Sequence, residues 1–561
     1  MSNTLKYNPE ESYLLHSMYN ELFLLNIDNN DYKTAKIHFQ KVLKYFDIFC
    51  SFFKYNNQAK DIVQELEQNL GTISKIASSH FDTKNLKKDN SNLDEFEKLF
   101  KKNNKEYAYK QIAENLHTRG ANKSATFFLE KAIALKPQDY HNYKILGKCY
   151  IELNKYQEAV TAFEKFNQFC QTDAETYVIL GFLYQNFGKY ENFETRINVL
   201  EKAIDLDPDN IDGLRCLAVT YKLFGNTESS IKYYERLLKL EPINEDYASY
   251  AYLKIKQGDF EEGLKYIDYR FKKENSPVYY PKINKPKWDG KISLDGKTLL
   301  VRFEQGFGDS IQFFRYLSKI KAKKIIFQVQ DELFNLFQKN AGDIKIIKQS
   351  TSLDEINFDY HIPLLSLLKI FEARINNIPT PEGYIKSDSD KTQFYKEKSF
   401  NNNKYKIGIA WQGLKSGNNY RNVDLKAFEL LTKLENVQVY SLQKGADEEL
   451  QTSINQGVNI IDLGQTFNDF SDTASAIENL NLVISSDNVI LNLAGAMGKK
   501  SFLLLNYDSS WRWFDGIDKT PWYDSVRIFK QDALKEPWEV VIEKTLRETL
   551  LTIKDTEKSK T

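Results

Sequence analysis

Histidine and cysteine are scarce in this chain of 561 residues, which has six histidines and four cysteines. All four cysteines lie in the N-terminal half without the paired spacing of a zinc site: Cys50, Cys149, Cys170 and Cys216. We therefore expect reduced, mostly buried thiols in a cytoplasmic protein. After residue 141 the only histidine is His361, beside an apolar run, so a carboxylate is the more plausible general base in that half.

An excess charge of one sign and long apolar runs are missing too. The chain has 77 basic and 77 acidic residues, so nothing indicates a nucleic-acid partner. No run of 18 apolar residues occurs, so we expect no membrane span. The first residues, MSNTLKYNPEESYLL, lack the basic start and apolar stretch of a signal peptide, which favours a cytoplasmic location. Aromatic residues are plentiful at 14%, which suits packed helices and sugar- or peptide-binding surfaces equally.

The N-terminal half repeats itself about every 34 residues. The repeated first-helix positions are Tyr143, Leu146, Gly147 and Tyr150, then Tyr177, Leu180, Gly181 and Tyr184, then Leu214, Leu217, Ala218 and Tyr221. A small residue lets two antiparallel helices touch, and a proline such as Pro137 or Pro242 ends the second helix. This period resembles the tetratricopeptide repeat (TPR).

The repeats define the predicted N-terminal domains. We expect a TPR solenoid over residues 106–271, with four clear repeats and a degenerate fifth over 244–271 that caps the stack. Residues 1–105 are predicted to be helical, and degenerate repeats are one interpretation of them. The concave face of such a solenoid binds an extended protein or peptide or packs on another domain, and a role as a rigid spacer stays open.

The pattern changes to alternating strands and helices after residue 271. A polar linker at 272–291 comes first, and the short apolar runs that follow are spaced for parallel strands: 299–301, 325–329, 344–347, 360–362, 406–410, 437–442, 482–485 and 501–505. A break near 387–403 divides the region into α/β halves at 292–400 and 401–546, with a charged tail at 547–561. A ligand is expected in the cleft between the halves, at the carboxyl ends of the strands.

A glycine-rich turn lies between Lys297 and Leu317. The apolar run enters a turn that holds Gly306 and Gly308, and a helical pattern follows with Asp309 in its first turn. A helix that starts this way presents unpaired N–H groups, which suit an anionic or sugar-bearing ligand. The third glycine of the dinucleotide fingerprint is missing, and a turn that merely joins a strand to its packed helix is the alternative.

Ordered motifs surround this turn and continue to the end of the α/β region. They are 258–260, 269–271, 288–290, 304–316, 408–413, 441–445, 472–474, 493–496, 511–513, 522–523 and 529–531. Together with the repeats they resemble the bacterial TPR proteins with a heptosyltransferase-type glycosyltransferase domain (glycosyltransferase family nine), over roughly residues 106–545. The resemblance implies a multidomain chain: an all-α TPR solenoid followed by an α/β GT-B fold of two Rossmann-like halves. It also implies a nucleotide-sugar donor in the C-terminal half.

Inverting sugar transfer needs a base for the acceptor hydroxyl and stabilisation of the departing nucleoside diphosphate. The resemblance implies that Asp309 is the catalytic base, because it occupies the position of the family's proposed base. The alternative is a helix N-terminal residue favoured by the dipole, whose field would weaken it as a base.

The resemblance also implies a donor site where the strand at 482–485 meets a helix. Asp487 and Gly495 match the family there, whereas Asn488 replaces a threonine and Asn492 a histidine. Since asparagine carries no charge, the leaving group would be less stabilised. Arg421 matches the family's arginine and could contact phosphate in a bidentate manner, or it could be a solvated loop residue.

Two further features bear on the donor site. Gln443 and Lys444 follow a strand and could contact ribose or phosphate, although a lysine in a surface turn is equally consistent with the pattern. Asp388–Ser389–Asp390 has the form of a metal-binding sugar-transferase motif, but no strand precedes it. Metal-free transfer fits the implied fold better, so we expect no metal and no cofactor apart from the nucleotide-sugar substrate.

Two functional hypotheses follow. The first is a cytoplasmic glycosyltransferase that moves a sugar from a nucleotide-sugar to a protein or glycan acceptor, with the repeats binding the acceptor or a partner. The second is a non-catalytic TPR scaffold with a degenerate GT-B region. Asp309, Arg421 and Asp487 favour the enzyme, whereas Asn488 and Asn492 favour the scaffold.

Overall fold

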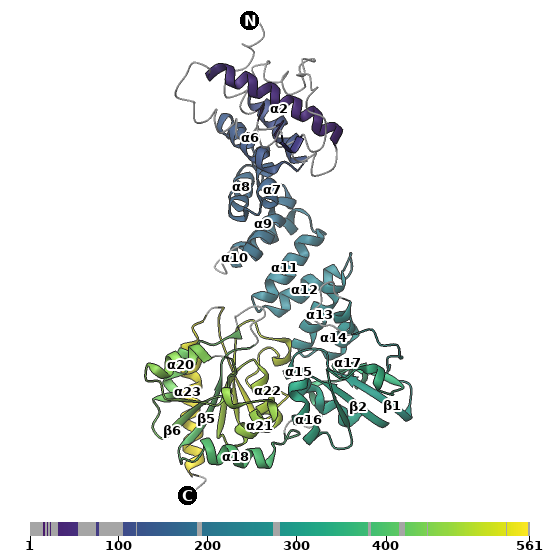
Figure 1. Ribbon diagram of the computed structural model, residues 1–561, viewed down its shortest axis with the longest axis vertical. Helices are drawn as coiled ribbons and strands as arrows, with labels where there is room; N and C mark the ends of the chain where they lie inside the picture. The colour runs from purple at the N-terminus through teal and green to yellow at the C-terminus, as the bar shows by residue number, and fades with distance from the viewer. Residues whose placement is uncertain are drawn as a thin grey trace. The chain divides into compact units, whose positions relative to one another are not determined.

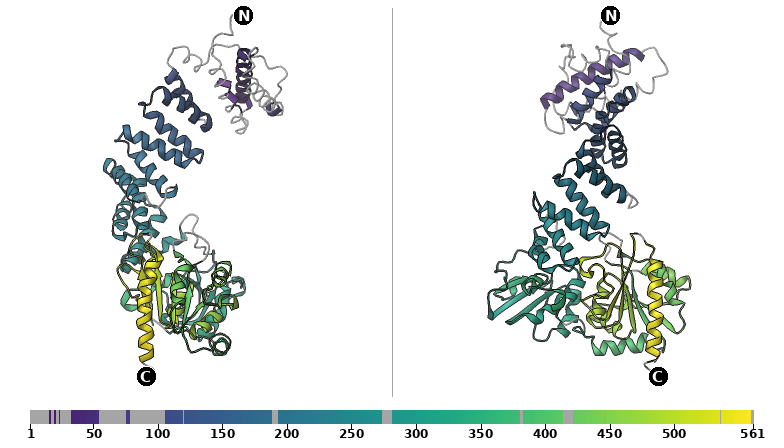
Figure 2. Two further views of the ribbon diagram at one scale, coloured as in Figure 1. Left: turned by 90° about the vertical axis from the view of Figure 1, so that its left-hand side faces the viewer. Right: turned by 180° about the vertical axis from the view of Figure 1, so that it is seen from behind.

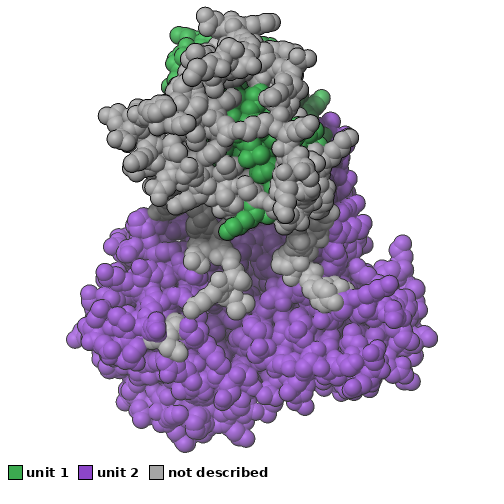
Figure 3. All heavy atoms as spheres, turned by 45° about the horizontal axis from the view of Figure 1, so that its top comes forward, with its two compact units in different colours: residues 1–216 green, residues 217–561 purple. Residues whose placement is uncertain are grey.

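The computed structural model describes residues 15–16, 19–20, 23, 32–53, 75–77, 105–118, 120–187, 193–272, 281–379, 383–413, 421–445, 447–534 and 536–558. It divides into two compact units, residues 1–216 and 217–561, which Figure 3 colours separately. Most of the predicted N-terminal region, residues 1–105, lies outside the described ranges. No helix within those ranges has both the length and the apolar character that crossing a bilayer requires.

The first unit contains successive antiparallel helix pairs (Figure 1). After α2 (Tyr32–Phe53) its helices are α5 (Lys105–Thr118), α6 (Asn122–Leu135), α7 (His141–Glu152), α8 (Tyr156–Phe169), α9 (Ala174–Phe187) and α10 (Phe193–Leu206). A Cβ atom on Gly147 would lie 2.6 Å from the Phe163 ring, so only glycine allows α7 and α8 to pack this closely. The repeat extends to charge pairs, because Lys110–Asp139 (3.1 Å) and Lys144–Asp173 (2.6 Å) recur 34 residues apart.

The second unit begins with more helices of the same kind. Helix α11 (Ile211–Leu223) spans the division, and α12 (Thr227–Leu237), α13 (Asn244–Lys256), α14 (Phe260–Tyr266) and the 3₁₀ helix η3 (Ile267–Phe271) follow. Ile255, Phe260 and Ile267 are buried in the same apolar core as the sheets that come later in the chain. The fifth repeat is therefore packed into the α/β region.

Four parallel strands form the first sheet, in the order β3-β2-β1-β4. They are β1 (Leu294–Arg302), β2 (Ala322–Val329), β3 (Lys345–Lys348) and β4 (Tyr360–Pro363). Alternate residues face two cores: Leu299 and Val301 face one, and Leu300 faces the other. Helix α15 (Phe307–Phe314) follows β1, and α16 (Phe334–Asn340) and α17 (Ser366–Ile370) follow β2 and β4. Part of the predicted linker adjoins the sheet, because the backbone N–H of Trp288 donates to His361.

Six parallel strands form the second sheet, in the order β10-β9-β8-β5-β6-β7. They are β5 (Tyr405–Ala410), β6 (Val437–Ser441), β7 (Ile460–Asp462), β8 (Leu482–Ser486), β9 (Ser501–Leu505) and β10 (Val526–Lys530). The order is that of a doubly wound sheet: successive strands are added on one side of β5 up to β7, and on its other side from β8 onward. The edge strands β7 and β10 were not predicted from the sequence.

Helices cover both faces of the second sheet, so the inner strands β6, β8 and β9 are buried throughout and β5 is buried over its last four residues. The covering helices are α18 (Ser389–Ser399), α19 (Glu429–Thr432), α20 (Asp447–Asn455), α21 (Phe470–Glu478), α22 (Val489–Ala496) and α23 (Trp538–Lys558). Helix α23 runs along β9 and β10 (Figure 2). Residues 547–558, which the sequence assigns to a charged tail, continue this helix, and Thr549 and Thr552 are buried.

Candidate functional site

A cavity of about 760 Å³ lies in the second unit at the carboxyl ends of strands from both sheets. Its wall includes residues that follow β1, β5, β6 and β8, and β5 and β8 flank the point where the strand order reverses. Ligands of doubly wound sheets bind at such a point. Of the predicted site residues, the cavity is lined by Gly306, Gly308, Asp309, Arg421, Gln443, Lys444, Asp487, Asn488 and Asn492.

Gly495 lies elsewhere. It is buried in α22, and a Cβ atom there would meet the Tyr523 ring at 2.6 Å. The glycine thus permits close packing of the helix on Tyr523 and does not reach the cavity wall.

Asp309 reaches the cavity from the first turn of α15. Its Oδ2 accepts a hydrogen bond from the backbone N–H of Gly306 (3.2 Å), which closes the turn. Its Oδ1 accepts from Arg512, through Nε at 2.8 Å and also through Nη2. The side chain of Asp309 is 12% exposed and lines the cavity, and a carboxylate oxygen such as Oδ2 can accept more than one hydrogen bond.

Arg512 was missed as a site residue by the sequence analysis, although the motif 511–513 contains it. It lines the cavity and joins Asp309 to Gln305, whose Oε1 accepts from Nη2 at 2.9 Å. Burial would lower the pKa of Arg512, but the carboxylates of Asp309 and Asp487 outweigh this effect and raise it. A tryptophan–arginine–tryptophan run carries no general signal for a ligand site, so only the fold could reveal this position.

The β8–α22 turn forms another part of the wall, through Asp487, Asn488 and Val489. Asn488 caps α22 with its Oδ1, which accepts from the backbone N–H groups of Ile490 (2.9 Å) and Leu491 (3.4 Å). Its amide nitrogen donates to Gln412 and Ser486. Asn488, which the resemblance places in the donor site, therefore has its side-chain amide engaged with protein atoms.

Asn492 lies where the two helices meet. Its Nδ2 would be 2.9 Å from a Cβ atom on Gly308, so the glycine of α15 allows α22 to approach. Its Oδ1 accepts from the hydroxyl of the buried Tyr523 (3.1 Å), and its Nδ2 donates to the Asn488 carbonyl (3.1 Å). These bonds fix Asn492 within the C-terminal half, at its contact with Gly308 of α15.

The remaining predicted side chains of the wall already have partners. Arg421 Nη1 lies 3.6 Å from Asp487 Oδ2, and the arginine side chain is 52% exposed. Lys444 donates to the backbone carbonyl of Phe467 (2.8 Å). Gln443 Oε1 accepts from the backbone N–H groups of Trp411 (3.2 Å) and Gln412 (3.0 Å), which joins the loops after β5 and β6.

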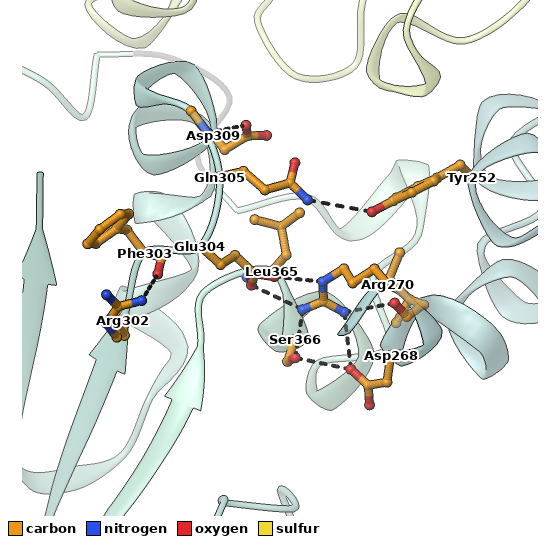
Figure 4. Close-up of polar contacts among 12 residues, drawn as sticks. Tyr252, Asp268, Arg270, Arg302, Phe303, Glu304, Gln305, Asp309, Leu365 and Ser366 are labelled. Carbon is orange, nitrogen blue, oxygen red and sulfur yellow. Dashed lines mark hydrogen bonds and ion pairs between the residues drawn. The ribbon is translucent and has the colours of Figure 1, made fainter. Parts of the chain in front are cut away.

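A second arginine–carboxylate pair lies just after β1 and is not part of the cavity lining (Figure 4). Arg270 of η3 donates to both oxygens of Glu304 (2.6 and 3.0 Å) and to the hydroxyl of Ser366 (2.9 Å). Glu304 also accepts from the backbone N–H of Leu365 (2.7 Å). Both charged side chains are almost fully buried, so this pair attaches the fifth repeat to the end of β1.

The motif Asp388–Ser389–Asp390 and Trp511 have structural roles. Asp388 caps α18 by accepting from the backbone N–H groups of Asp390 and Lys391. Trp511 stacks on Tyr252 of the fifth repeat, with ring centroids 5.4 Å apart. In the described ranges we find no cluster of three or more histidine, cysteine, aspartate or glutamate side chains suited to a metal ion.

Comparison with known proteins supports the repeats. Family profiles described as tetratricopeptide repeat match residues 145–168, 174–210 and 217–244, so the predicted TPR repeats are confirmed. Protein FlbA of Caulobacter vibrioides is 27% identical over 319 residues, which cover 51% of this chain and 52% of FlbA. The chain thus spans about half the length of the curated relative it matches.

Solved structures similar to part of this chain are also known. MamA is 24% identical, with a TM-score of 0.27, over 28% of this chain and 91% of that chain. YrrB, described as a TPR protein with an unusual peptide-binding site, is 17% identical, with a TM-score of 0.29, over 31% of this chain and 90% of that chain. The chain thus contains TPR repeats, confirmed by the family profiles, and an α/β region with two parallel sheets.

Proposed function

We propose that the second unit is a GT-B glycosyltransferase that binds a nucleotide-sugar in the cavity between its two sheets. One observation carries this proposal: side chains from segments far apart in the sequence line one cavity at the carboxyl ends of both sheets. The volume of about 760 Å³ suits a ligand of nucleotide-sugar size. Three helices, α15, α21 and α22, begin at the wall with Phe307, Phe470 and Val489, and helix N-termini favour anions.

In this proposal Asp309 acts as the general base. The oxygen of the acceptor hydroxyl attacks the anomeric carbon of the donor sugar, and its proton passes to the free lone pair of Asp309 Oδ2. The bond between the anomeric carbon and the diphosphate oxygen breaks, and the nucleoside diphosphate leaves with the bonding electrons. Because attack and departure are on opposite faces, the anomeric configuration inverts.

The repeats supply the acceptor in this account. TPR solenoids bind extended segments on their concave faces, so a protein or peptide is the acceptor class we favour. Arg270 and Glu304 attach the last repeat to the strand that leads to Asp309, and this contact supports a link between that repeat and the proposed base.

A non-catalytic scaffold is the second candidate, and a specific observation favours it. Asn488 and Asn492 are engaged with protein atoms, and the carboxylate of Asp309 is paired with Arg512. A cavity wall of this kind could bind a nucleotide without turning it over.

Release of nucleoside diphosphate from a panel of nucleotide-sugars separates the two candidates. The full-length protein is incubated with ADP-, CDP-, GDP- and UDP-linked sugars, with and without a protein extract as acceptor source. The enzyme proposal predicts release with one nucleotide, which Asp309→Asn reduces at least about 100-fold, a typical contribution of a general base. Binding of a nucleotide-sugar without release by the wild-type protein would establish the scaffold instead.

A further inference from the structure

We propose that Arg512 is the cation that contacts the diphosphate in this cavity, and that it supplies the positive charge that Asn492 cannot carry. The inference deepens the proposed function and rests on it for the identity of the ligand. Its physical claim is narrower: a pyrophosphate-type anion binds against the guanidinium of Arg512.

The guanidinium is held in a fixed place at the cavity wall. Its Nε and Nη2 donate to Asp309, Nη2 donates to Gln305 (2.9 Å), and Nη1 donates to the hydroxyl of Ser510 (3.1 Å). The backbone carbonyl of Arg512 accepts from Trp522 Nε1 (2.7 Å), and the guanidinium carbon lies 4.7 Å from the centroid of the Trp511 ring. An arginine fixed from both ends loses little conformational entropy when it binds an anion.

One donor of this guanidinium is left over. Arginine has five N–H groups, and the contacts to Asp309, Gln305 and Ser510 use four of them. Among the residues that the structure describes, none accepts from the second N–H of Nη1. Since Arg512 lines the cavity and its side chain is 15% exposed, this N–H can be offered to a phosphate oxygen.

The other two cations that the structure describes at the cavity wall are less suited to this contact. Arg421 is 52% exposed, so water competes for its charge, and Asp487 lies 3.6 Å away. Lys444 is exposed and already donates to the Phe467 carbonyl. Of these three described cations, Arg512 combines burial, fixed position and an unused donor.

Arg512 also lies beside the position that lacks a charge. Asn492 abuts Gly308, and Arg512 is bonded to Asp309, the next residue along α15. Asn492 and Arg512 therefore approach the same helix start from the C-terminal half. Arg512, which lies in the loop after β9, would therefore contact the ligand at the end of the cavity where Asn492 contributes no charge.

Inorganic pyrophosphate is the probe that tests this inference. Its affinity for the full-length protein is measured by isothermal titration calorimetry in the wild type, Arg512→Gln, Arg512→Lys and Asp309→Asn. We expect Arg512→Gln to weaken binding at least about tenfold, in line with the loss of a charged hydrogen bond. Arg512→Lys should recover part of the loss. Asp309→Asn should tighten binding, because a competing negative charge is removed.

The opposite signs of the two substitutions are the discriminating result. A merely structural pair would make Arg512→Gln and Asp309→Asn weaken binding together, which would overturn the inference. Arg527→Gln is the matched control, because Arg527 pairs with Glu548 (2.5 Å) away from the cavity and should leave the affinity unchanged. Thermal unfolding of each variant verifies that it is folded.

The remaining outcomes separate this inference from the proposed function. If the wild type does not bind pyrophosphate, or if the Arg512→Gln variant binds it equally well, the inference is wrong. If pyrophosphate binding depends on Arg512 but no nucleotide-sugar binds, the inference holds and the glycosyltransferase proposal fails. If a nucleotide-sugar is turned over equally by wild type and Arg512→Gln, the enzyme proposal holds and Arg512 has no part in it.

Discussion

Two arginine–carboxylate pairs flank the turn between β1 and α15, and they differ in almost every physical respect. Arg270 and Glu304 are almost fully buried, and Glu304 is bound through both oxygens with a further backbone donor. Arg512 and Asp309 line a cavity with 15% and 12% of their side chains exposed. The first pair is saturated and holds a repeat against a sheet. The second retains unused hydrogen-bonding capacity, which is what a ligand site requires.

Breaking the buried pair should have the largest effect on stability. Arg270→Met leaves the Glu304 carboxylate buried without its partner, so we expect the free energy of unfolding to fall by about 3–5 kcal/mol. Denaturant unfolding of the full-length protein measures the change. Arg374→Met is the control, because Arg374 forms an exposed pair with Glu261 (3.6 Å) worth about 0–1 kcal/mol. Equal losses of stability for Arg270→Met and Arg374→Met would contradict the structural role of the buried Arg270–Glu304 pair.

Gly308→Ala should have the next largest effect on stability. The new Cβ atom would lie 2.9 Å from Asn492 Nδ2, which Tyr523 and Asn488 hold in place, so we expect a loss of about 1–3 kcal/mol from overpacking. Gly306→Ala is the matched control, since its Cβ would meet only Asp309 Oδ2 at 3.7 Å and its φ is −70°. A Gly306→Ala variant as unstable as Gly308→Ala would show that the turn, and not the contact between α15 and α22, sets the requirement.

Removing the charge of Arg512 should lower the free energy of unfolding less than removing that of Arg270. For Arg512→Gln we expect a loss of about 1.5 kcal/mol, because water in the cavity can solvate the carboxylate of Asp309 that loses its partner. The same denaturant experiment gives the value. A loss as large as that of Arg270→Met would mean that Arg512 is a structural residue like Arg270.

The smallest effect concerns the cap of α22. Asn488→Ala should cost about 1 kcal/mol, whereas Asn488→Thr should retain most of the stability, since threonine also caps helices. Thermal unfolding compares the two variants. If threonine lowers the stability as much as alanine does, the hydrogen bonds that the Asn488 amide donates to Gln412 and Ser486 matter more than the cap.

The repeats and most strands could be predicted because their signals are local. The spacing of Gly147 and Gly181 reports helix contact directly, and apolar runs such as 482–485 report buried parallel strands. The edge strand β7 was missed because it has only three residues, and β10 because it is only partly buried. Asp309 and Gly308 could be proposed from a turn pattern.

The role of Arg512 depends on a contact between residues 203 positions apart, and no local pattern indicates such a contact. The same holds for Gly495, whose neighbour Tyr523 is distant in the sequence. For Asn488 the pattern of a strand followed by a polar residue fits a hydrogen-bond donor to phosphate and a helix cap equally. Only the positions of Ile490 and Leu491 reveal the cap.

The most direct test of this account is a calorimetric titration of the full-length protein with ADP, CDP, GDP and UDP. We predict that one of them binds with one site per chain and a Kd of about 1 mM or below, the range of substrate affinities in enzymes. Val489→Trp, which places a large ring at the cavity wall, should abolish that binding while the protein stays folded. Absence of binding for all four nucleotides, or binding that Val489→Trp leaves intact, would contradict a nucleotide site in this cavity.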